Sequence, residues 1–235
     1  MSNLTGRSYK VWAEDAAAYG PVDAATLAQW IQEARVFPET FVQPQSDLRW
    51  RPAANVETLR EKFPVTADTG MLELERGIST VAGALREFPL FSVLSSEGLE
   101  QVAALGRCCE FAEGDMIVRQ GDPGDAVYFV LSGELRVRLL VGVVDKMDKT
   151  LCKLGPGELF GELGMLLQSK RTADVIAEKA SRVFCMTTNA FQLLVKQVPE
   201  VASPLLFNLC ATMARRIAAD NQRFYREVTS QFVWS

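Results

Sequence analysis

Residues 160–175 read FGELGMLLQSKRTADV, and this stretch is the most informative part of the chain. Gly161 lets the backbone approach a ligand closely, and residues 163–167 can form a short helix whose free N–H groups face an anion. Arg171 can return to the same place as a bidentate guanidinium. This combination predicts a cradle for a phosphate group.

Glu162 stands at the mouth of the same expected helix, nine residues before Arg171. A carboxylate there can accept a hydrogen bond from a hydroxyl beside the phosphate, and a ribose 2′-OH is a natural donor. A cyclic nucleotide carries both groups. The alternative is an exposed ion pair between Glu162 and Arg171, which would contribute only about 0 to 1 kcal/mol, against about 1.5 to 3 kcal/mol for each hydrogen bond to a desolvated charge.

Short strand-like segments punctuated by glycine flank this stretch and predict a β-barrel or roll. The turn at residues 121–125, GDPGD, combines the fixed φ of proline with the tolerance of glycine for positive φ. We expect these glycines to shape the roll and the ligand chemistry to lie elsewhere. The segments are CCEFAEGDMIVRQGDPGDAVYFVLSGELRVRLL, LCKLGPGELFGELG, ADVIA and RVFCM.

From residue 85 to residue 228 the chain resembles the cyclic-nucleotide-binding domain family, which includes protein kinase A regulatory subunits and the catabolite activator protein. The resemblance rests on LREFPLFSVLSSEGLEQVA, EGDMIVRQGDPGDAVYFVLSGELRV and the quoted stretch, which matches the family's phosphate-binding cassette. It implies that Glu162 holds the ribose hydroxyl and Arg171 the cyclic phosphate. The other cassette positions implied to line the pocket are Phe160, Gly161, Leu163, Thr172 and Ala173.

The base of the nucleotide is left open by the same resemblance. A threonine beside the arginine, as at Thr172, favours guanine in channel relatives, whereas the cassette alanine is commoner in cAMP-selective proteins. We take cAMP as the default bacterial ligand and cGMP as the alternative. The MARR segment at residues 213–216 is similar to the catabolite activator branch, which implies base contacts from Asp220 and Asn221; the alternative is that these two side chains face solvent.

The C-terminal region is predicted to be helical. Thr188 can cap a helix that ends near Pro199, and Ser203 with Pro204 can open a longer helix that runs to about Val228. Its apolar residues form a narrow seam, which predicts pairing of two helices in a homodimer. The seam comprises Leu206, Cys210, Met213, Ile217, Phe224 and Val228, interrupted at Asp220 or Asn221.

Residues 1–63 differ in composition from the rest, since they carry three of the four tryptophans and no cysteine. This difference predicts a separate small α+β module. Asp23 can cap a helix with an apolar stripe at Leu27, Trp30, Ile31 and Ala34, and residues 9–12, residues 41–43 and the region of Trp50 are expected to be strands around it.

The string YGPVDAATLAQW in this module resembles the bacterial GYF-2 branch of the GYF family, over residues 9–59, with a Tyr-Gly-Pro turn leading into the helix. The resemblance implies a shallow aromatic platform for short peptides, with Trp12, Tyr19 and Trp30 as candidates. Where eukaryotic members carry their triplet after the helix, this chain has Ala34, Arg35 and Val36, which puts proline-rich ligands in question. The alternative is that the aromatic residues fill the core.

Composition excludes several classes of function. The chain of 235 residues has no histidine, which removes histidine-based catalysis and imidazole metal sites, and its net charge of −4 argues against nonspecific attraction to DNA or anionic membranes. Its five cysteines lack a metal-type CxxC pair, and no apolar run approaches the ~18 residues that cross a bilayer. We expect a soluble cytoplasmic protein without a metal.

These observations predict an α+β chain with a GYF-like module at residues 1–63, a linker and connecting helix at 64–84, and a cyclic-nucleotide-binding domain with a dimerisation helix at 85–235. We expect a sensor that acts on an unidentified protein through the N-terminal module, and not an enzyme. We expect no DNA binding either, because the chain shows no recognition helix after its long helix. The alternative is a scaffold whose pocket is empty or constitutively filled.

Overall fold

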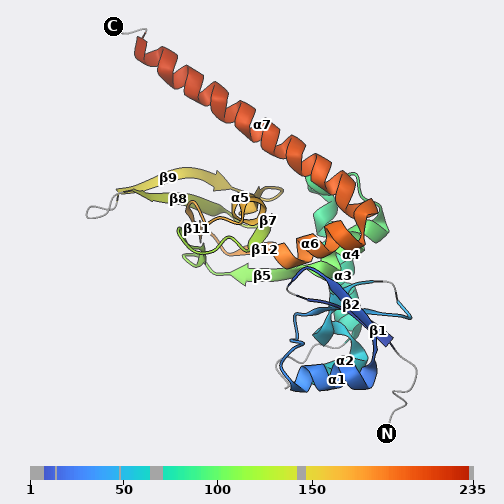
Figure 1. Ribbon diagram of the computed structural model, residues 1–235. Coiled ribbons are helices and arrows are strands. Elements are labelled where there is room, and N and C mark those ends of the chain that lie inside the picture. Colours follow the sequence, from blue (N-terminus) through green and yellow to red (C-terminus); the bar gives the residue numbers. More distant parts are fainter. Residues whose placement is uncertain (1–7, 14, 48, 64–70, 142–146, 233–235) are drawn as a thin grey trace.

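The computed structural model describes residues 8–13, 15–47, 49–63, 71–141 and 147–232. An N-terminal unit of short strands and helices lies beside a β-roll, and a long C-terminal helix projects from the body (Figure 1). The linker expected at residues 64–70 lies outside the described residues, and the connecting helix expected after it is α3 (Met71–Arg86).

The N-terminal unit is an antiparallel four-stranded sheet of order β2-β1-β3-β4 packed with α1. Asp23 caps α1 as predicted, because its side chain accepts a 2.7 Å hydrogen bond from Thr26 N. Two expectations fail: Ala34 lies exposed beyond the end of the helix, and Tyr19 lies within a strand rather than a turn. The elements are β1 (Ser8–Trp12), β2 (Ala18–Asp23), α1 (Ala24–Gln32), β3 (Phe41–Pro44), β4 (Arg51–Pro52), η1 (Ala53–Asn55) and α2 (Glu57–Arg60).

The predicted roll consists of two four-stranded antiparallel sheets, of order β10-β7-β12-β5 and β6-β11-β8-β9. Its interior holds the alternate apolar residues of facing strands, among them Val130, Leu135, Val175 and Val183. The strands are β5 (Arg107–Phe111), β6 (Met116–Val118), β7 (Ala126–Ser132), β8 (Leu135–Val141), β9 (Met147–Leu154), β10 (Leu159–Phe160), β11 (Asp174–Ala177) and β12 (Ser181–Thr187).

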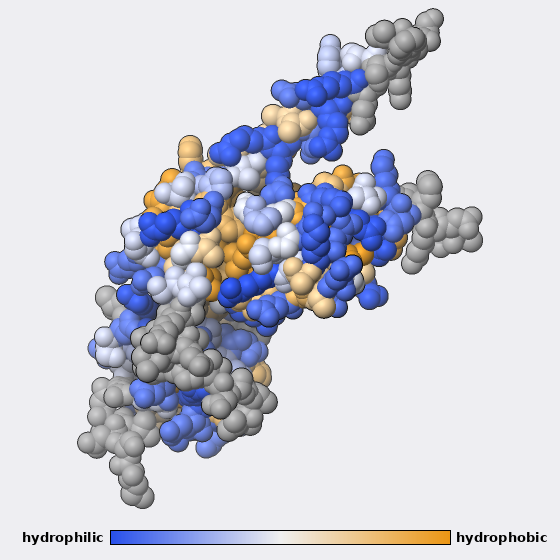
Figure 2. Space-filling model, turned by 180° about the vertical axis from the view of Figure 1, so that it is seen from behind, coloured by the Kyte–Doolittle hydropathy of each residue, from blue (hydrophilic) through white to orange (hydrophobic). Residues whose placement is uncertain are grey.

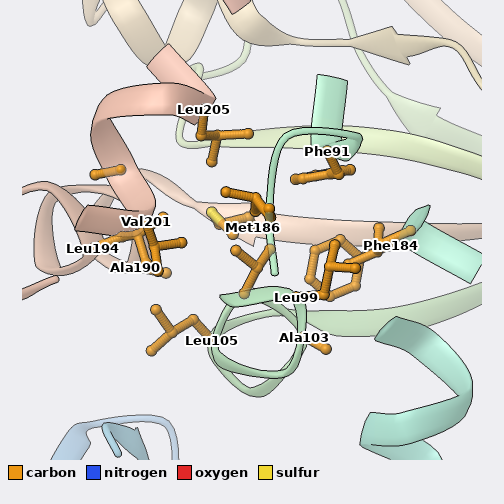
Figure 3. Packing of buried hydrophobic residues seen from close by; sticks show 14 of the residues in the cluster. Phe91, Leu99, Ala103, Leu105, Phe184, Met186, Ala190, Leu194, Val201 and Leu205 are labelled. Carbon is orange, nitrogen blue, oxygen red and sulfur yellow. The ribbon is translucent and has the colours of Figure 1, made fainter. Parts of the chain in front are cut away.

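Helices from both ends of the domain pack on the sheet that contains β12. Figure 3 shows Leu99 of α4 next to Met186 of β12, with Leu194 of α6 and Val201 of α7 gathered to one side, and Leu105 of α4 belongs to the same cluster. This single apolar cluster ties the helices to the roll, so they are placed by the same core. The helical elements are η2 (Pro89–Phe91), α4 (Ser96–Leu105), α5 (Glu162–Leu167), α6 (Thr188–Gln197) and α7 (Pro199–Phe232).

The C-terminal helices differ from the prediction in their starts. The side chain of Thr187, not Thr188, caps α6 by accepting a hydrogen bond from Ala190 N. Helix α7 begins at Pro199, and Pro204 lies inside it. Because the side chains of Val201 and Ala202 are buried in the core, helical geometry is favoured before Pro204, and the proline removes only one backbone hydrogen bond near the start.

Candidate functional site

The cassette lies between β10 and β11, and its backbone is shaped around one glycine. Gly161 has φ +83° and is the N-cap of α5, so the expected short helix begins one residue earlier than predicted, at Glu162. A side chain at position 161 would place its Cβ 2.7 Å from Arg171 Nη1 and 2.9 Å from Ala126 O. Only glycine fits here, and it lets the guanidinium lie directly against the backbone.

Arg171 is 93% buried and its guanidinium is held by three acceptors. Nη1 donates to Ala126 O at 2.8 Å and to Gly161 O at 3.1 Å, and Nη2 donates to Asp125 Oδ1 at 3.1 Å. The guanidinium also lies over the ring of Tyr128, 5.5 Å from its centroid. Since a buried guanidinium keeps its charge, this arrangement presents a fixed cation in a largely desolvated place.

The glycine turn at residues 121–125 is part of this site, which corrects the expectation that it only shapes the roll. Gly121 N donates to Arg171 O at 2.9 Å, and Arg171 N donates to Asp122 O at 2.7 Å. Gly124 N donates to Ser169 O at 3.0 Å, so the turn lies alongside the cassette. It also supplies Asp125, the carboxylate partner of Arg171, which the sequence reasoning missed because nothing in the local pattern indicates which loop the turn faces.

Glu162 is also buried, with 8% of its surface exposed, and its partner comes from the distant helix α7. Arg216 Nη1 donates to Glu162 Oε1 at 3.0 Å, while Arg216 Nη2 donates to Leu159 O at 2.6 Å. Glu162 and Arg171 therefore have separate partners and do not form the exposed ion pair considered above. The MARR segment at residues 213–216 contains Arg216, but its resemblance implies base contacts only from Asp220 and Asn221, and no pattern in the sequence indicates this pairing of Arg216 with Glu162.

The remaining cassette residues differ in their exposure. Phe160 is buried and stacks on Tyr128, with ring centroids 4.9 Å apart and the planes 8° from parallel. Burial raises the pKa of Tyr128 to about 12, so its hydroxyl stays protonated at neutral pH. Ala173 is buried, whereas the side chains of Leu163 and Thr172 are exposed.

Asp220 and Asn221 lie on α7 at or just beyond one turn after Arg216, and both side chains are exposed. This part of α7 lies close to β9, because Arg216, Arg223 and Asp220 all act electrostatically on the thiol of Cys152. Burial is the larger effect on that thiol and raises its pKa. The two candidates for base contact thus lie on the helix that contributes Arg216 to the site, and their side chains are open to solvent.

A second charged group supports the cassette from the outer side of the roll. Asp174, almost fully buried at the start of β11, accepts hydrogen bonds from Gln120 N at 2.7 Å and Arg138 Nη2 at 2.7 Å. Burial alone would raise the pKa of Asp174, but these hydrogen bonds outweigh it and hold the pKa below its ordinary value. The ionised carboxylate therefore anchors the strand that follows Arg171.

The three candidates for a peptide platform are not brought together on one exposed face. Trp12 is only 1% exposed and its Nε1 donates to Asn189 Oδ1 of α6 at 2.7 Å, so it lacks the exposure that a platform requires. Trp30 is half-buried beneath Arg35, whose guanidinium lies 4.8 Å from the ring centroid. Tyr19 is exposed, and its hydroxyl donates to Asp15. The alternative, that these aromatic side chains fill the core, therefore applies fully to Trp12 and partly to Trp30.

Within the described residues, no group of three or more His, Cys, Asp or Glu side chains could hold a metal ion. Across the same part of the chain, no helix has the length and apolar character needed to span a membrane.

Family comparison matches residues 108–198 to the cyclic nucleotide-binding domain. The cyclic AMP receptor protein of Thermus thermophilus is 34% identical over 129 residues, which cover 55% of this chain and 57% of that protein. Glutaminase 1 of Bradyrhizobium diazoefficiens is 32% identical over 139 residues, covering 59% of this chain and 22% of that enzyme. The chain thus spans from about a fifth to just over half of the length of these relatives.

Solved structures agree on the fold. The Thermus thermophilus catabolite activator protein superposes with a TM-score of 0.51 and 29% identity, over 58% of this chain and 61% of that chain. A cyclic nucleotide-binding domain from Methylobacillus flagellatus has a TM-score of 0.57 at 21% identity, over 65% of this chain and 85% of that chain. Residues 108–198 match the cyclic nucleotide-binding domain, and in this region the chain is similar to the cyclic AMP receptor protein of Thermus thermophilus and to a cAMP-dependent protein kinase regulatory subunit of Hypocrea atroviridis.

Proposed function

We propose that this chain is a bacterial sensor of a cyclic nucleotide that regulates a partner protein through its N-terminal unit. The observation that carries the proposal is the pair of buried charges at one glycine: Arg171 packs against the backbone of Gly161, and Glu162 follows Gly161 directly. Desolvating charged groups is costly even when they are paired, so two buried charges beside one glycine are candidates for a binding role, and both lie in the region that matches the cyclic nucleotide-binding domain.

The chemistry assigns one group of the ligand to each charge. The cyclic phosphate would accept hydrogen bonds from the fork of Arg171, exchanging for the contact with the exposed carboxylate of Asp125. Glu162 would accept a hydrogen bond from the ribose 2′-OH, and backbone at Gly161, Leu163 and Thr172 would close the pocket. In this arrangement Arg171 binds the phosphodiester, Glu162 binds the ribose, and neither is used as a nucleophile for cleavage, which supports a sensor rather than an enzyme.

The ligand we propose is cAMP, with cGMP as the alternative. The similarity to a protein named cyclic AMP receptor protein supports cAMP. The exposed Thr172 beside Arg171 is compatible with a contact to guanine. We propose that Asp220 of α7, with Asn221 beside it, accepts a hydrogen bond from the exocyclic amine of adenine when the helix closes over the pocket.

The same helix links the site to a homodimer. The guanidinium of Arg216 on α7 forms an ion pair with Glu162. A ribose hydroxyl that binds to this carboxylate would therefore compete with Arg216 for it. Beyond its base, α7 is a largely hydrophilic rod that leaves the body, as Figure 2 shows from behind. We propose that two such rods pair.

The proposed dimer seam starts one residue later than the sequence indicates. Leu206 and Met213 of the expected seam are half-buried against the core. A neighbouring row of exposed side chains on α7 has members that are alternately three and four residues apart, which is the spacing of a paired helix. The large apolar side chains of this row are exposed to solvent: Phe207 is 75% exposed, Ile217 is 59% exposed and Phe224 is 68% exposed. The row comprises Phe207, Cys210, Ala214, Ile217, Asn221 and Phe224, and it continues to Val228, whose side chain is half-buried.

Thermal unfolding tests the proposal against the alternative of a scaffold without a ligand. A ligand at a hundred times its dissociation constant stabilises the folded chain by about 2.7 kcal/mol. We expect cAMP, cGMP or both to raise the melting temperature, and 5′-AMP, which lacks the cyclic phosphodiester, to serve as the control. A flat melting temperature across millimolar cyclic mononucleotides would reject the proposal.

A further inference from the structure

The N-terminal unit and the helices on the roll share one core. Trp12, Phe41 and Trp50 are buried in the same apolar cluster as residues of α4 and α6, and the rings of Trp12 and Trp50 meet edge to face with their centroids 6.2 Å apart. Trp12 Nε1 also donates to Asn189 Oδ1 of α6 at 2.7 Å. Because separation of the two units would expose these three aromatic side chains to water, the space between the units keeps a fixed shape.

A cleft of about 840 Å³ lies between the two units. Phe41 of β3 and Pro52 of β4, which are paired with each other, line it from the N-terminal unit. Leu105, the last residue of α4, lines it from the other side. Binding sites in proteins are commonly clefts of this size at the junction of two units, with an apolar lining and a few polar groups. The cleft is therefore a preformed candidate for a second binding site.

Helix α6 supplies two amide side chains to the cleft. Asn189 and Gln192 both line it and are three residues apart, so they lie on the same face of the helix. Asn189 uses its Oδ1 for the bond from Trp12, and its Nδ2 makes no hydrogen bond to a described residue. Primary amides both donate to and accept from peptide groups, so this side of the cleft suits the backbone of an extended peptide.

The charged side chains that line the cleft carry an excess of negative charge. Glu39 and Asp125 are its two carboxylates, and both residues are exposed. Arg107 is its one guanidinium and lies beside Cys185, where burial raises the pKa of the thiol to about 11 and the charge of Arg107 acts in the opposite direction. Two carboxylates against one guanidinium favour an occupant that carries a cationic group.

Asp125 belongs both to the cleft and to the candidate nucleotide site. Its side chain is 79% exposed, and its Oδ1 accepts from Arg171 Nη2 at 3.1 Å. Its backbone oxygen accepts from Thr188 N at 2.7 Å, which holds the residue beside the start of α6. A cyclic phosphate on Arg171 exchanges for the contact with Asp125, so nucleotide binding leaves this carboxylate unpaired at the cleft.

We propose that the cleft binds an extended segment of a partner protein through an arginine side chain that pairs with Asp125, and that the cyclic nucleotide strengthens this binding. The inference rests on the proposed function, since it takes a cyclic phosphate to replace Asp125 on Arg171. A guanidinium suits the cleft better than an ammonium, because it matches a carboxylate with two parallel N–H donors and packs on an aromatic ring such as Phe41. The coupling is positive, because the arginine of the partner replaces the cation that Asp125 loses to the phosphate.

A peptide array probed with the full chain tests the chemistry of the partner. Each heptapeptide, blocked at both ends, has a central arginine, and its counterpart has the same sequence with citrulline, which has nearly the same shape and no charge. At saturating cAMP we expect a subset of the arginine peptides to bind at least tenfold more tightly than their citrulline counterparts. If no arginine peptide is preferred, the inference is wrong. If agmatine alone binds as tightly as the peptides, the cleft is a site for a small cation and the proposed partner is wrong.

Gln192→Arg tests whether the selected peptides lie in the cleft. The variant puts a competing guanidinium into the cleft and should weaken binding of the peptides at least tenfold. The matched control is Gln197→Arg, the same change at an exposed position of α6 outside the cleft, which should leave the peptide affinity within twofold. Equal peptide affinities for the two variants would place the peptides elsewhere and overturn the inference.

Fluorescence anisotropy of a selected peptide, with and without cAMP, tests the coupling through Asp125. We expect cAMP to tighten peptide binding by about five- to tenfold, a ratio that falls below twofold in Asp125→Asn and persists in Asp122→Asn, an exposed position of the same turn. If the chain binds cAMP and the ratio is one, or if the ratio persists in Asp125→Asn, the coupling through Asp125 is wrong while the proposed function stands. If no cyclic nucleotide binds, the proposed function fails and the coupling falls with it, whereas peptide binding that Gln192→Arg weakens would still establish the cleft as a site.

Discussion

Arg216 Nη1 lies 3.0 Å from Glu162 Oε1, although the two residues are 54 positions apart in the chain. The pair joins the projecting helix α7 to the first residue of α5, inside the cassette. A second bond, from Arg216 Nη2 to Leu159 O, fixes the guanidinium against the strand that leads into the cassette. The Glu162 carboxylate, which we propose binds the ribose hydroxyl, therefore also holds the C-terminal helix α7 against the cassette.

Arg216→Ala should tighten cyclic nucleotide binding about two- to fivefold. The ion pair is partly exposed, so its loss corresponds to about 0.5 to 1 kcal/mol, and the ligand no longer competes for Glu162. Calorimetry of the variant, with Arg215→Ala as the control on the exposed side of the same turn, measures the effect. A tenfold loss of affinity would contradict the competition and would instead indicate that Arg216 contacts the nucleotide itself.

Arg171→Ala should lower nucleotide affinity by at least tenfold, because each hydrogen bond between the guanidinium and a charged phosphate contributes about 1.5 to 3 kcal/mol. Arg171→Lys should not restore it, since an ammonium cannot reproduce the fork. The measurement is the rise in melting temperature that the ligand causes in each variant. The control is Lys170→Ala, at an exposed neighbouring position, and circular dichroism confirms that each variant folds. Affinity within threefold of the unmodified chain for Arg171→Ala would exclude the proposed phosphate contact.

The chain should be a homodimer paired along α7. Ile217→Glu and Phe224→Glu place charges in the proposed seam and should give monomers, whereas Ala219→Glu, on the opposite face, should leave the dimer intact. Sedimentation velocity at micromolar concentration distinguishes these states. A monomeric unmodified chain, with or without nucleotide, would contradict the pairing.

The stability of the roll should fall in acid through Asp174. Its pKa in the folded chain is below the ordinary value near 3.8, so the folded state holds this proton less tightly than the unfolded state does. The stabilisation is therefore present above about pH 4 and is lost as the pH falls below it. Asp174→Asn should cost about 2 kcal/mol at pH 7, and the difference from the unmodified chain should shrink towards pH 3.

Urea unfolding at both pH values measures this effect. Asp148→Asn removes an exposed partner of the same Arg138 and should cost less than about 1 kcal/mol at either pH. An Asp174→Asn cost that does not change between pH 7 and pH 3 would show that the charge of Asp174 does not stabilise the fold.

Local patterns in the sequence predicted the elements that local chemistry determines. Alternating strand segments predicted the roll, Asp23 predicted the start of α1, and Gly161 was expected where the backbone must approach closely. The starts of α6 and α7 were wrong by one and by several residues, because buried contacts of Val201 and Ala202 outweigh the usual preference for Ser-Pro at a helix start.

Long-range contacts were the part that the sequence could not supply. The partners of Glu162, Arg171 and Trp12 come from positions 54, 46 and 177 residues away. No periodicity or spacing specifies such pairs, since they depend on how α6, α7 and the glycine turn are placed by the common core. Trp12 therefore suggested an open platform in the sequence, while in the fold it is a buried anchor.

Titration calorimetry of the full chain with cAMP and cGMP is the most direct test of the central claim that Arg171 and Glu162 form a cyclic nucleotide site. We predict binding of one nucleotide per chain with a dissociation constant of 1 μM or tighter, about −8 kcal/mol, for at least one of the two, and none for 5′-AMP at the same concentration. Absence of binding by both cyclic nucleotides at millimolar concentration, in a chain shown to be folded, would contradict the account.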